Sequence, residues 1–383
     1  MSSTDRPIIA GAGPVGLGAA LFLARQGCTT RLVEIRDEPA RQSRALAVNP
    51  RTLTLLQPSG VTDQMLELGS PIRGVQFHRS GRVAAALSFA GVHPKYPFML
   101  GLSQATTERL LARALEAAGG MVERGVRIVA CRNAVDGVEV VLEAGGGLRE
   151  VAKGPWLLAA DGAHSAARQQ LGIDFVGSSF KQEWHLADAP LRTTLADDHA
   201  HVFFLGEGAF LFMIRVVDEA QKSRANNPVW RIMGNRSEPL SRLVQAEQTG
   251  PPVWTSSFRI SHRINATLSA GAVYFAGDAA HVHSPLGARG MNLGLEDAWV
   301  FSELVRNGRL PEYDRLRHPV DRGVVRRVKI LARIASAESW FDRFIRNYVL
   351  LKAINIPSIR ALMVATITGL DHALPRSVAD GTG

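Results

Sequence analysis

Apolar and polar positions follow a helical period and a strand period in alternation near the N-terminus. A short apolar run at 7–10 leads into glycines, and residues 14–25 then have helical composition up to Gly27. A second apolar run follows at 30–34. Because strand, helix and strand succeed each other within so few residues, the pattern predicts one compact βαβ unit.

The period changes several times further along the chain. Residues 71–98 and about 177–261 alternate or form β-rich runs, which favours antiparallel strands. Helical periodicity returns at 104–118. Buried strands are predicted at 156–160 and 272–276, each of which ends next to an aspartate and a glycine. The sequence therefore predicts an α/β protein with a second, strand-rich part interleaved in the first.

The predicted domains are discontinuous. A Rossmann-like dinucleotide-binding domain comprises residues 1–71, 100–176 and 265–310, and a mostly antiparallel β-sheet domain comprises 72–99 and 177–264. A helical, amphipathic region covers residues 311–383. At 383 residues the chain is long enough to bury more than one core.

Composition excludes several classes of protein. The two cysteines, Cys28 and Cys131, have no ligand-like spacing, which argues against a disulfide scaffold and a metal site and favours a cytoplasmic protein. The net charge of +9 is concentrated between residues 306 and 333 without interleaved aromatic residues, so we expect a solvated helix face and no nucleic-acid partner. No signal peptide and no run of about 20 apolar residues is found.

The segment 348–370 mixes apolar residues with Lys352 and Arg360. This pattern fits a helix that covers the core, and it also fits peripheral contact with a lipid surface. It predicts no stable membrane insertion.

The first chemical motif lies between the first strand and the first helix and reads Gly11-Ala12-Gly13-Pro14-Val15-Gly16. Gly11 permits a tight turn, Gly13 lets the backbone approach a pyrophosphate, and Gly16 lets the helix pack closely on its strands. Phosphates are favoured at the helix N-terminus. Glu34 ends the second strand, where its carboxylate can accept hydrogen bonds from a ribose. The motif predicts a dinucleotide site but leaves NAD and FAD open.

The second motif follows the strand at 156–160. It places Asp161 at the carboxyl edge of the predicted parallel sheet, where α/β proteins bind ligands. Arg168, one turn into the next helix, could pair with this carboxylate or with a phosphate. An equally weighted alternative is that Asp161 only caps the helix.

The third motif combines Gly277-Asp278 with the glycine-rich run from Pro285 to Gly294. A strand delivers Asp278 to the sheet edge, and the run opens a helix that reaches about Val305. The positive potential at such a helix N-terminus suits the edge of a flavin ring, which becomes anionic on reduction.

The three motifs, in this order and at these separations, resemble the single-component, FAD-dependent aromatic hydroxylases, or class A flavoprotein monooxygenases, such as p-hydroxybenzoate hydroxylase and the phenol-type hydroxylases. Residues 43–53 resemble the segment in which an Arg contacts FAD. Residues 98–111, with Gln104, resemble the segment beside the flavin. The resemblance covers nearly the whole chain to about Val305.

The resemblance implies FAD as the cofactor and NAD(P)H as a transient reductant without a domain of its own. It also implies that Asp161 and Arg168 serve FAD or the nicotinamide nucleotide, and that the Pro285 backbone lies near both flavin and substrate. The expected cofactor-binding residues are Gly11, Gly13, Pro14, Val15, Gly16, Glu34, Arg44, Gln104, Asp161, Arg168, Asp278, Pro285, Gly287, Gly290, Met291 and Asn292.

The implied reaction inserts one atom of O2 into an aromatic or polycyclic, phenol-like molecule through a flavin C4a-hydroperoxide. Some relatives carry an Asp where Leu46 stands here, and use it near the substrate. Candidate bases in the strand-rich segments are His78, His93, Tyr96, His185, His199 and His201, of which His201 is the one retained. Candidate pocket residues are Phe203, Phe204, Phe210, Phe212 and Met213.

Other activities fit part of the sequence. An NAD-dependent dehydrogenase would share only the first motif. A quinone-ring hydroxylase, an epoxidase, a prenyl reductase and a non-catalytic flavin-binding protein would share all three. A flavin halogenase is disfavoured because no two tryptophans form a Trp-x-Trp pair.

Overall fold

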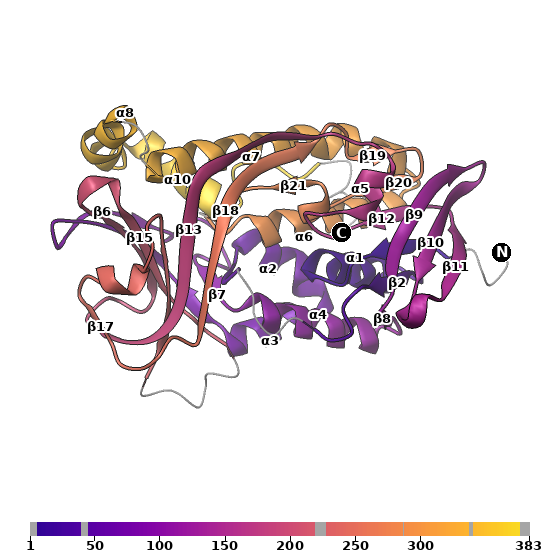
Figure 1. Ribbon diagram of the computed structural model, residues 1–383, viewed down its shortest axis with the longest axis horizontal. Coiled ribbons are helices and arrows are strands. Elements are labelled where there is room, and N and C mark those ends of the chain that lie inside the picture. Colours follow the sequence, from indigo (N-terminus) through magenta and orange to yellow (C-terminus); the bar gives the residue numbers. More distant parts are fainter. Residues whose placement is uncertain (1–5, 40–44, 219–226, 286, 337–339, 376–383) are drawn as a thin grey trace.

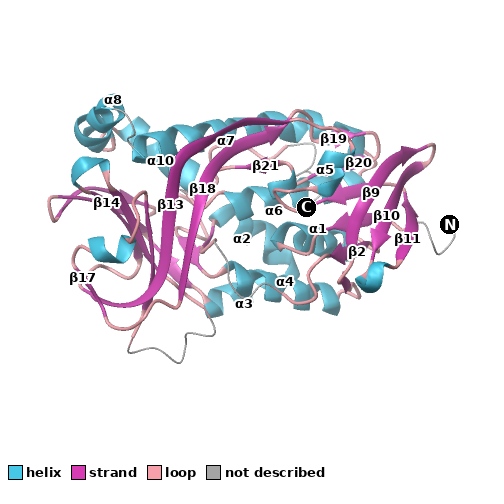
Figure 2. Cartoon of the chain, in the orientation of Figure 1, coloured by secondary structure: helices cyan, strands magenta, loops and turns pink. Residues whose placement is uncertain are grey.

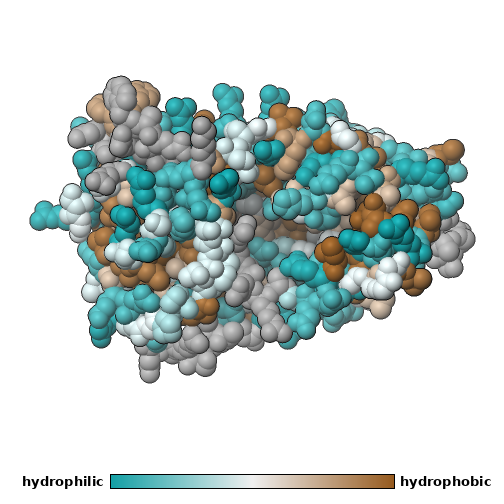
Figure 3. All heavy atoms as spheres, in the orientation of Figure 1, coloured by the Kyte–Doolittle hydropathy of each residue, from teal (hydrophilic) through white to brown (hydrophobic). Residues whose placement is uncertain are grey.

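The computed structural model describes residues 6–39, 45–218, 227–285, 287–336 and 340–375 (Figure 1). It is elongated, with a nucleotide-binding half that carries a parallel sheet and a second half built on a large antiparallel sheet (Figure 2). Hydrophobic side chains on the face in Figure 3 form scattered groups among hydrophilic ones.

The nucleotide-binding half is built on a six-stranded sheet in the order β19-β20-β12-β1-β2-β8. All neighbours in it are parallel except β19 and β20. The predicted βαβ unit is confirmed as β1, α1 and β2. The elements are β1 (Ile8–Ala10), α1 (Pro14–Arg25), β2 (Arg31–Glu34), β8 (Val122–Arg124), β12 (Leu157–Ala159), β19 (Ser269–Ala270) and β20 (Val273–Phe275).

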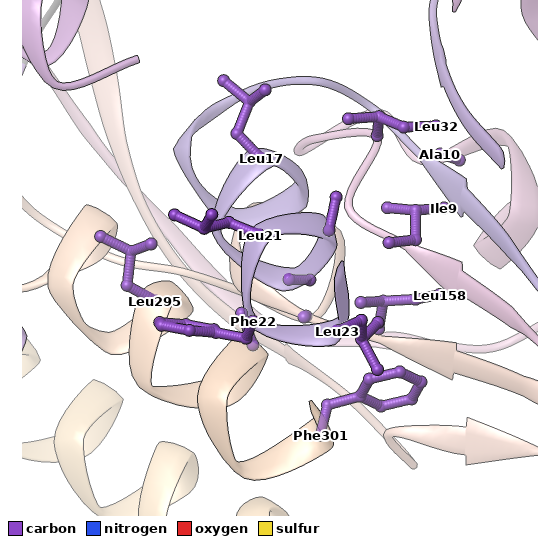
Figure 4. Packing of buried hydrophobic residues seen from close by; sticks show 14 of the residues in the cluster. Ile9, Ala10, Leu17, Leu21, Phe22, Leu23, Leu32, Leu158, Leu295 and Phe301 are labelled. Carbon is purple, nitrogen blue, oxygen red and sulfur yellow. The ribbon is translucent and has the colours of Figure 1, made fainter. Parts of the chain in front are cut away.

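Helix α1 lies between this sheet and α6 (Gly290–Arg306), as Figure 4 shows. Leu23 is fully buried in the same cluster as Leu158 of the sheet and Phe301 of α6. A Cβ on Gly18 would lie 2.5 Å from a methyl carbon of Leu295, so the small residue sets how closely the two helices approach. Because each buried side chain of this size contributes roughly 1.5–3 kcal/mol, this packing stabilises the position of α1 against α6.

The second half is built on a nine-stranded sheet in the order β21-β18-β13-β16-β15-β14-β5-β6, with β17 beside β13. Its pairs are antiparallel except β14 and β5. The strands are β5 (Gly74–Arg79), β6 (Arg82–Ser88), β13 (Phe175–Thr193), β14 (His199–Phe204), β15 (Phe210–Arg215), β16 (Val229–Gly234), β17 (Ala246–Gln248), β18 (Trp254–Asn265) and β21 (His281–Val282).

Two long strands run between the halves. β13 and β18 pair along most of their length and extend from the large sheet back to the nucleotide-binding half (Figure 1). Their register is interrupted between Ser179 and Glu183. At the far end β18 pairs with β21, which lies between the two parts of the third motif. The third motif is thus tied by backbone hydrogen bonds to the large sheet.

Two small antiparallel sheets complete the strands. One contains β9 (Arg127–Ala134), β10 (Gly137–Glu143) and β11 (Arg149–Gly154), and the other β3 (Ala47–Val48), β4 (Ser70–Ile72) and β7 (Met99–Gly101). The remaining helices are α2 (Pro50–Leu56), α3 (Val61–Leu68), α4 (Gln104–Ala117), α5 (Ala166–Gln170), α7 (Tyr313–Ser336), α8 (Trp340–Phe344), α9 (Leu351–Ala353) and α10 (Pro357–Thr368).

The region after residue 311 is helical, as expected, but not all of its basic residues are solvated. Arg317 of α7 is completely buried and forms ion pairs with Glu296, Asp297 and Asp321. The expectation of a purely solvated basic face was therefore wrong, because three buried carboxylates replace water around this guanidinium. No helix within the described part of the chain is long and apolar enough to cross a bilayer.

Candidate FAD and substrate site

The first glycine loop leaves open space where a pyrophosphate would lie. Gly11 has φ +93°, and a Cβ there would lie 2.4 Å from the carbonyl oxygen of Ala160. A Cβ on Gly16 would lie 1.8 Å from the carbonyl oxygen of Gly11, whereas a Cβ on Gly13 would meet no atom within 4 Å. Gly11 and Gly16 are thus required by packing, and Gly13 faces an empty cradle at the uncapped start of α1.

Glu34 is buried at the end of β2. Its Oε2 accepts a hydrogen bond from the Ala12 N–H at 2.7 Å, and its Oε1 pairs with Arg36. Burial alone would raise the pKa of Glu34, but the hydrogen bonds from Arg36 and Ala12 outweigh it and lower that pKa. The carboxylate is therefore charged and lies beside the first glycine loop.

The second motif is joined to the third through Arg168. The guanidinium of Arg168 donates to the carbonyl oxygens of Ala163 at 2.7 Å and Ala279 at 3.2 Å. Asp161 Oδ2 accepts from the Ala166 N–H at 2.8 Å, while Asp161 Oδ1 is buried without a hydrogen-bond partner. Asp161 therefore supports the first turn of α5 with one oxygen, and its other oxygen has no partner among the described residues.

The third motif is held by a buried ion-pair cluster. Asp297 Oδ2 accepts from the Gly277 N–H at 3.2 Å and from His281 Nε2 at 2.7 Å. Burial opposes a charge on His281, but the carboxylates of Asp297 and Asp321 outweigh it and raise the pKa of His281 to about 9. This cluster supports the turn that carries Asp278, whose side chain is exposed on the cavity described next.

The residues 283–290, here called the flavin loop, lead into α6. Residue 286 lies outside the described residues. No side chain caps the N-terminus of α6. Asn292 accepts from the Asn49 N–H and donates to the carbonyl oxygens of Ala47 and Ala288, so its side chain ties the loop to β3 and α2. The N–H groups of the first turn therefore point away from the chain's own side-chain acceptors.

A cavity of about 890 Å³ connects the flavin loop with the large sheet. Among the expected cofactor residues, those that line it are Gln104, Arg168, Asp278, Pro285, Gly287, Gly290 and Met291. Gly11, Gly13, Pro14, Val15, Gly16, Glu34, Asp161 and Asn292 lie outside its lining. Arg44 lies outside the described residues. Val15 connects the two groups, because it is the side chain nearest to Gly277 and Gly294.

The sheet contributes one face to this cavity. Val202 and Phe204 of β14 and Phe210 and Phe212 of β15 line it, together with Val75 and Phe77 of β5. Successive strand residues point to opposite faces. Phe203 and Met213 accordingly belong to a separate cluster on the other face. Three of the five expected pocket residues, Phe204, Phe210 and Phe212, thus reach the cavity.

The candidate base His201 does not reach the cavity. It is fully buried on the far face of the sheet, where its Nε2 donates to the carbonyl oxygen of Ala196 at 2.8 Å. Its Nδ1 lies 3.1 Å from Nε2 of His78. Because both ring nitrogens are engaged inside a packed cluster, the structure gives His201 no access to a substrate. The physical reason is the strand period, which places residues 201 and 203 opposite to 202 and 204.

The structure instead brings His283, a residue that the sequence reasoning missed, to the cavity. Nδ1 of His283 lies 3.0 Å from the Ser284 carbonyl oxygen, which can only accept, so Nδ1 carries the proton. Nε2 is then a free acceptor, and no hydrogen-bond partner for it is found in the described structure. Burial lowers the pKa of His283 to about 3, so the ring stays neutral. The sequence signal is the alternation His281-Val282-His283 just before the flavin loop.

The chain belongs to the family described as "FAD binding domain", whose match covers residues 6–328. The residues fit this cofactor: the first loop has an open cradle at Gly13, two helix N-termini are uncapped, and one carboxylate oxygen of Asp161 has no partner. FAD is therefore the cofactor of this fold.

Similar proteins are monooxygenases by name. A 6-methylpretetramide 4-monooxygenase from Streptomyces rimosus is 35% identical over 78% of this chain. A pentachlorophenol 4-monooxygenase from Sphingobium chlorophenolicum is 28% identical over 76% of it. The chain spans 56% of the length of each of these two relatives.

Solved structures share the fold. An anhydrotetracycline hydroxylase from Streptomyces rimosus has a TM-score of 0.78 and 25% identity, covering 97% of this chain and 77% of its own. A p-nitrophenol 4-monooxygenase from Pseudomonas putida has a TM-score of 0.82 and 19% identity, covering 98% of this chain and 100% of its own.

Proposed function

We propose that the protein is a cytoplasmic, FAD-dependent monooxygenase that uses NAD(P)H and O2 to insert one oxygen atom into a polycyclic, phenol-like aromatic molecule. The observation that carries this proposal is the cavity, which runs from the flavin loop to an apolar sheet face. The cavity, of about 890 Å³, must hold the ring end of FAD as well as the substrate, and Phe77, Phe204 and Phe212 on its sheet side suit a substrate of several fused rings. Bound FAD would supply the redox chemistry, accepting a hydride from NAD(P)H and activating O2.

The chain's own residues would orient the substrate and keep water out. Phe77, Phe204, Phe212 and Phe258 line the sheet side of the cavity and can pack against flat rings. Leu46 is buried in the same lining, where some members of the resembled family carry an Asp. An apolar wall at this point favours a ring system without a charged group there.

His283 would hold the reacting hydroxyl group. Its neutral Nε2 can accept a hydrogen bond from a phenol, and the residue lies in the flavin loop, two residues before Pro285. A hydroxyl group held in this way becomes more electron-donating toward its ring, which suits transfer of oxygen to an adjacent carbon.

The test is oxygen-dependent NAD(P)H oxidation by the FAD-loaded protein, with products analysed by mass spectrometry. The panel includes single-ring phenols, hydroxyanthraquinones and tetracyclic ketones. Polycyclic phenols are expected to stimulate NAD(P)H oxidation and to gain the mass of one oxygen atom. NAD(P)H oxidation that yields only hydrogen peroxide with every compound would contradict the proposal and favour another flavin-dependent activity.

A further inference from the structure

The end of α10 is inserted between the flavin loop and α2. Gly369 has φ +79° and terminates the helix. A Cβ on Gly369 would lie 2.2 Å from Asn49 Nδ2 and 2.4 Å from Arg289 Nη1, so the backbone itself fills this space. The carbonyl oxygen of Gly369 accepts from Arg51 Nε at 2.8 Å. Residues 369–372 are here called the latch.

Asp371 of the latch pairs with the flavin loop. Its Oδ1 lies 3.1 Å from Nη2 of Arg289, and both side chains are 1% exposed. Its Oδ2 pairs with Arg327 of α7 at 2.7 Å. Removing one member of a buried ion pair is strongly destabilising, because the other charge is then left buried without a partner. Asp371 therefore restrains the position of Arg289, the residue that immediately precedes α6.

His372 makes a second connection, to the first half of α6. Its Nε2 lies 2.6 Å from Glu296 Oε1, and its Nδ1 lies 3.0 Å from Asp371 Oδ1. Both acceptors are carboxylates, so both ring nitrogens donate and the ring is a cation. The latch thus contacts α6 on both sides of the turn that presents its uncapped N–H groups.

Helix α10, which leads directly into the latch, forms part of the cavity wall. Met363 and Ile367 line the cavity, and Ile367 is two residues before Gly369. A molecule bound against this wall would touch α10, and the ring end of FAD would touch the loop that the same segment holds.

We propose that the latch positions the flavin loop for FAD, with Asp371 as its central positioning residue. An aromatic molecule in the cavity then strengthens FAD binding through α10. By thermodynamic linkage, FAD strengthens binding of that molecule by the same factor. The proposal rests on the FAD site and the cavity; it does not depend on the oxygen-insertion reaction.

The first experiment measures FAD binding to the apoprotein by quenching of FAD fluorescence. Asp371→Asn keeps the shape of the side chain and removes its charge, and it is expected to raise the Kd for FAD about tenfold. Glu247→Gln removes a partner of Arg192 in an exposed ion pair, and serves as the matched control with unchanged Kd. Wild-type FAD affinity in a folded Asp371→Asn protein would overturn the proposal.

Hydrogen exchange separates positioning from general stability. In Asp371→Asn apoprotein, exchange is expected to rise in residues 283–296 and to stay unchanged in β14 and β15. An equal rise throughout the protein would indicate a merely structural role and overturn the assignment. If Asp371→Asn does not fold, Arg289→Lys is used instead, because it keeps a cation opposite Asp371. A loss of FAD affinity smaller than the tenfold expected for Asp371→Asn supports the latch, and unchanged affinity overturns it.

Linkage is tested with 1-hydroxyanthraquinone as the probe. For the wild type, a saturating amount of probe is expected to lower the Kd for FAD about fivefold or more, and for Asp371→Asn the ratio is expected to approach one. A ratio of one in the wild type, or the same ratio in both proteins, would overturn the coupling. Because only binding is measured, preserved coupling without oxygen insertion would contradict the proposed function alone.

Discussion

Asn292 at the start of α6 accepts a hydrogen bond from the main-chain N–H of Asn49, at 2.9 Å, although 243 residues separate them. Asn49 in turn caps α2, because its side chain accepts from the Thr52 N–H. One amide therefore ties the flavin loop to β3, whose Ala47 lines the cavity, and to the N-terminus of α2.

Replacing Asn292 with Ala is expected to lower the free energy of unfolding by about 2–4 kcal/mol. The substitution leaves the buried Asn49 N–H and the carbonyl of Ala47 without partners, and each costs roughly 1–3 kcal/mol. Urea unfolding of the apoprotein measures the change. Asn292→Asp, which keeps the acceptor and loses the donor, should fall between Ala and the wild type. No change in either variant would mean that water replaces these bonds.

Gly13→Val should remove FAD binding without unfolding the protein. A Cβ at residue 13 meets no atom of the described residues within 4 Å, so a side chain there extends into the space expected for the pyrophosphate. The expected result is colourless protein with a Kd for FAD raised about a hundredfold or more, and an apoprotein unfolding free energy within about 0.5 kcal/mol of the wild type.

Gly16→Ala is the matched control for Gly13→Val. Its Cβ would collide with the carbonyl of Gly11 at 1.8 Å, so it should lower both stability and FAD affinity. Full retention of FAD by Gly13→Val would refute the assignment of the first loop.

Asp278→Ala should weaken FAD binding or slow its reduction by NAD(P)H, by about tenfold in either case. Asp278 faces the cavity beside the flavin loop, and its turn is held independently by Asp297. Stopped-flow reduction and fluorescence titration separate the two effects. Wild-type behaviour in both would mean that the third motif does not contact the flavin.

The two faces of β15 should respond differently to shortening. Phe212→Ala enlarges the cavity and is expected to raise the KM for an aromatic substrate several-fold. Leu211→Ala removes a buried side chain from the opposite face and should leave KM unchanged while lowering stability by about 2–5 kcal/mol. Steady-state kinetics and urea unfolding on both variants test the assignment, and equal KM changes would contradict it.

The contribution of the buried histidines to the free energy of unfolding should be greatest near pH 6.5. Burial, together with the neighbouring His201, lowers the pKa of His78 to about 4, and burial lowers the pKa of His262 to about 4. Between pH 6.5 and pH 4 these two histidines are protonated in the unfolded chain but neutral in the folded protein. The free energy of unfolding therefore falls, as the pH is lowered, by up to about 1.4 kcal/mol per pH unit for each histidine.

The opposite sign applies to His281, whose pKa of about 9 means that its stabilisation is lost as the pH rises from 6.5 to 9. Urea unfolding from pH 4.5 to 9 gives the profile. His78→Leu should flatten the acid side, whereas His164→Gln, at an exposed position, should not change it. An acid slope that His78→Leu leaves unaltered would assign the effect to other groups.

Local pattern was sufficient to predict the nucleotide-binding unit. β1, α1, β2, α4 and α6 lie where periodicity, glycines and aspartates placed them, because short-range spacing determines each of them. The small sheet of β9, β10 and β11 was not predicted, since its strands lie inside a segment whose ends read as nucleotide-binding elements.

Side-chain placement was harder to predict than the elements. Alternation along β14 showed that half of its residues face the cavity, but not which half, so His201 was chosen and Val202 was not. The pairing of Arg289 with Asp371, 82 residues further on, depends on how α7 and α10 return to the core. The burial of Arg317 also depends on how α7 packs against the core, so the net charge of the segment could not predict it.

The two strands that pass between the halves also limit how this protein can be recombined. Since β13 and β18 each belong to both halves and pair with one another, exchanging the sheet half for that of a relative requires junctions inside both strands. The break in their register between Ser179 and Glu183 is the place where such junctions disturb the fewest ladder hydrogen bonds. A chimera joined there receives a new aromatic wall. Its flavin loop keeps the original connection to the end of β18 through β21.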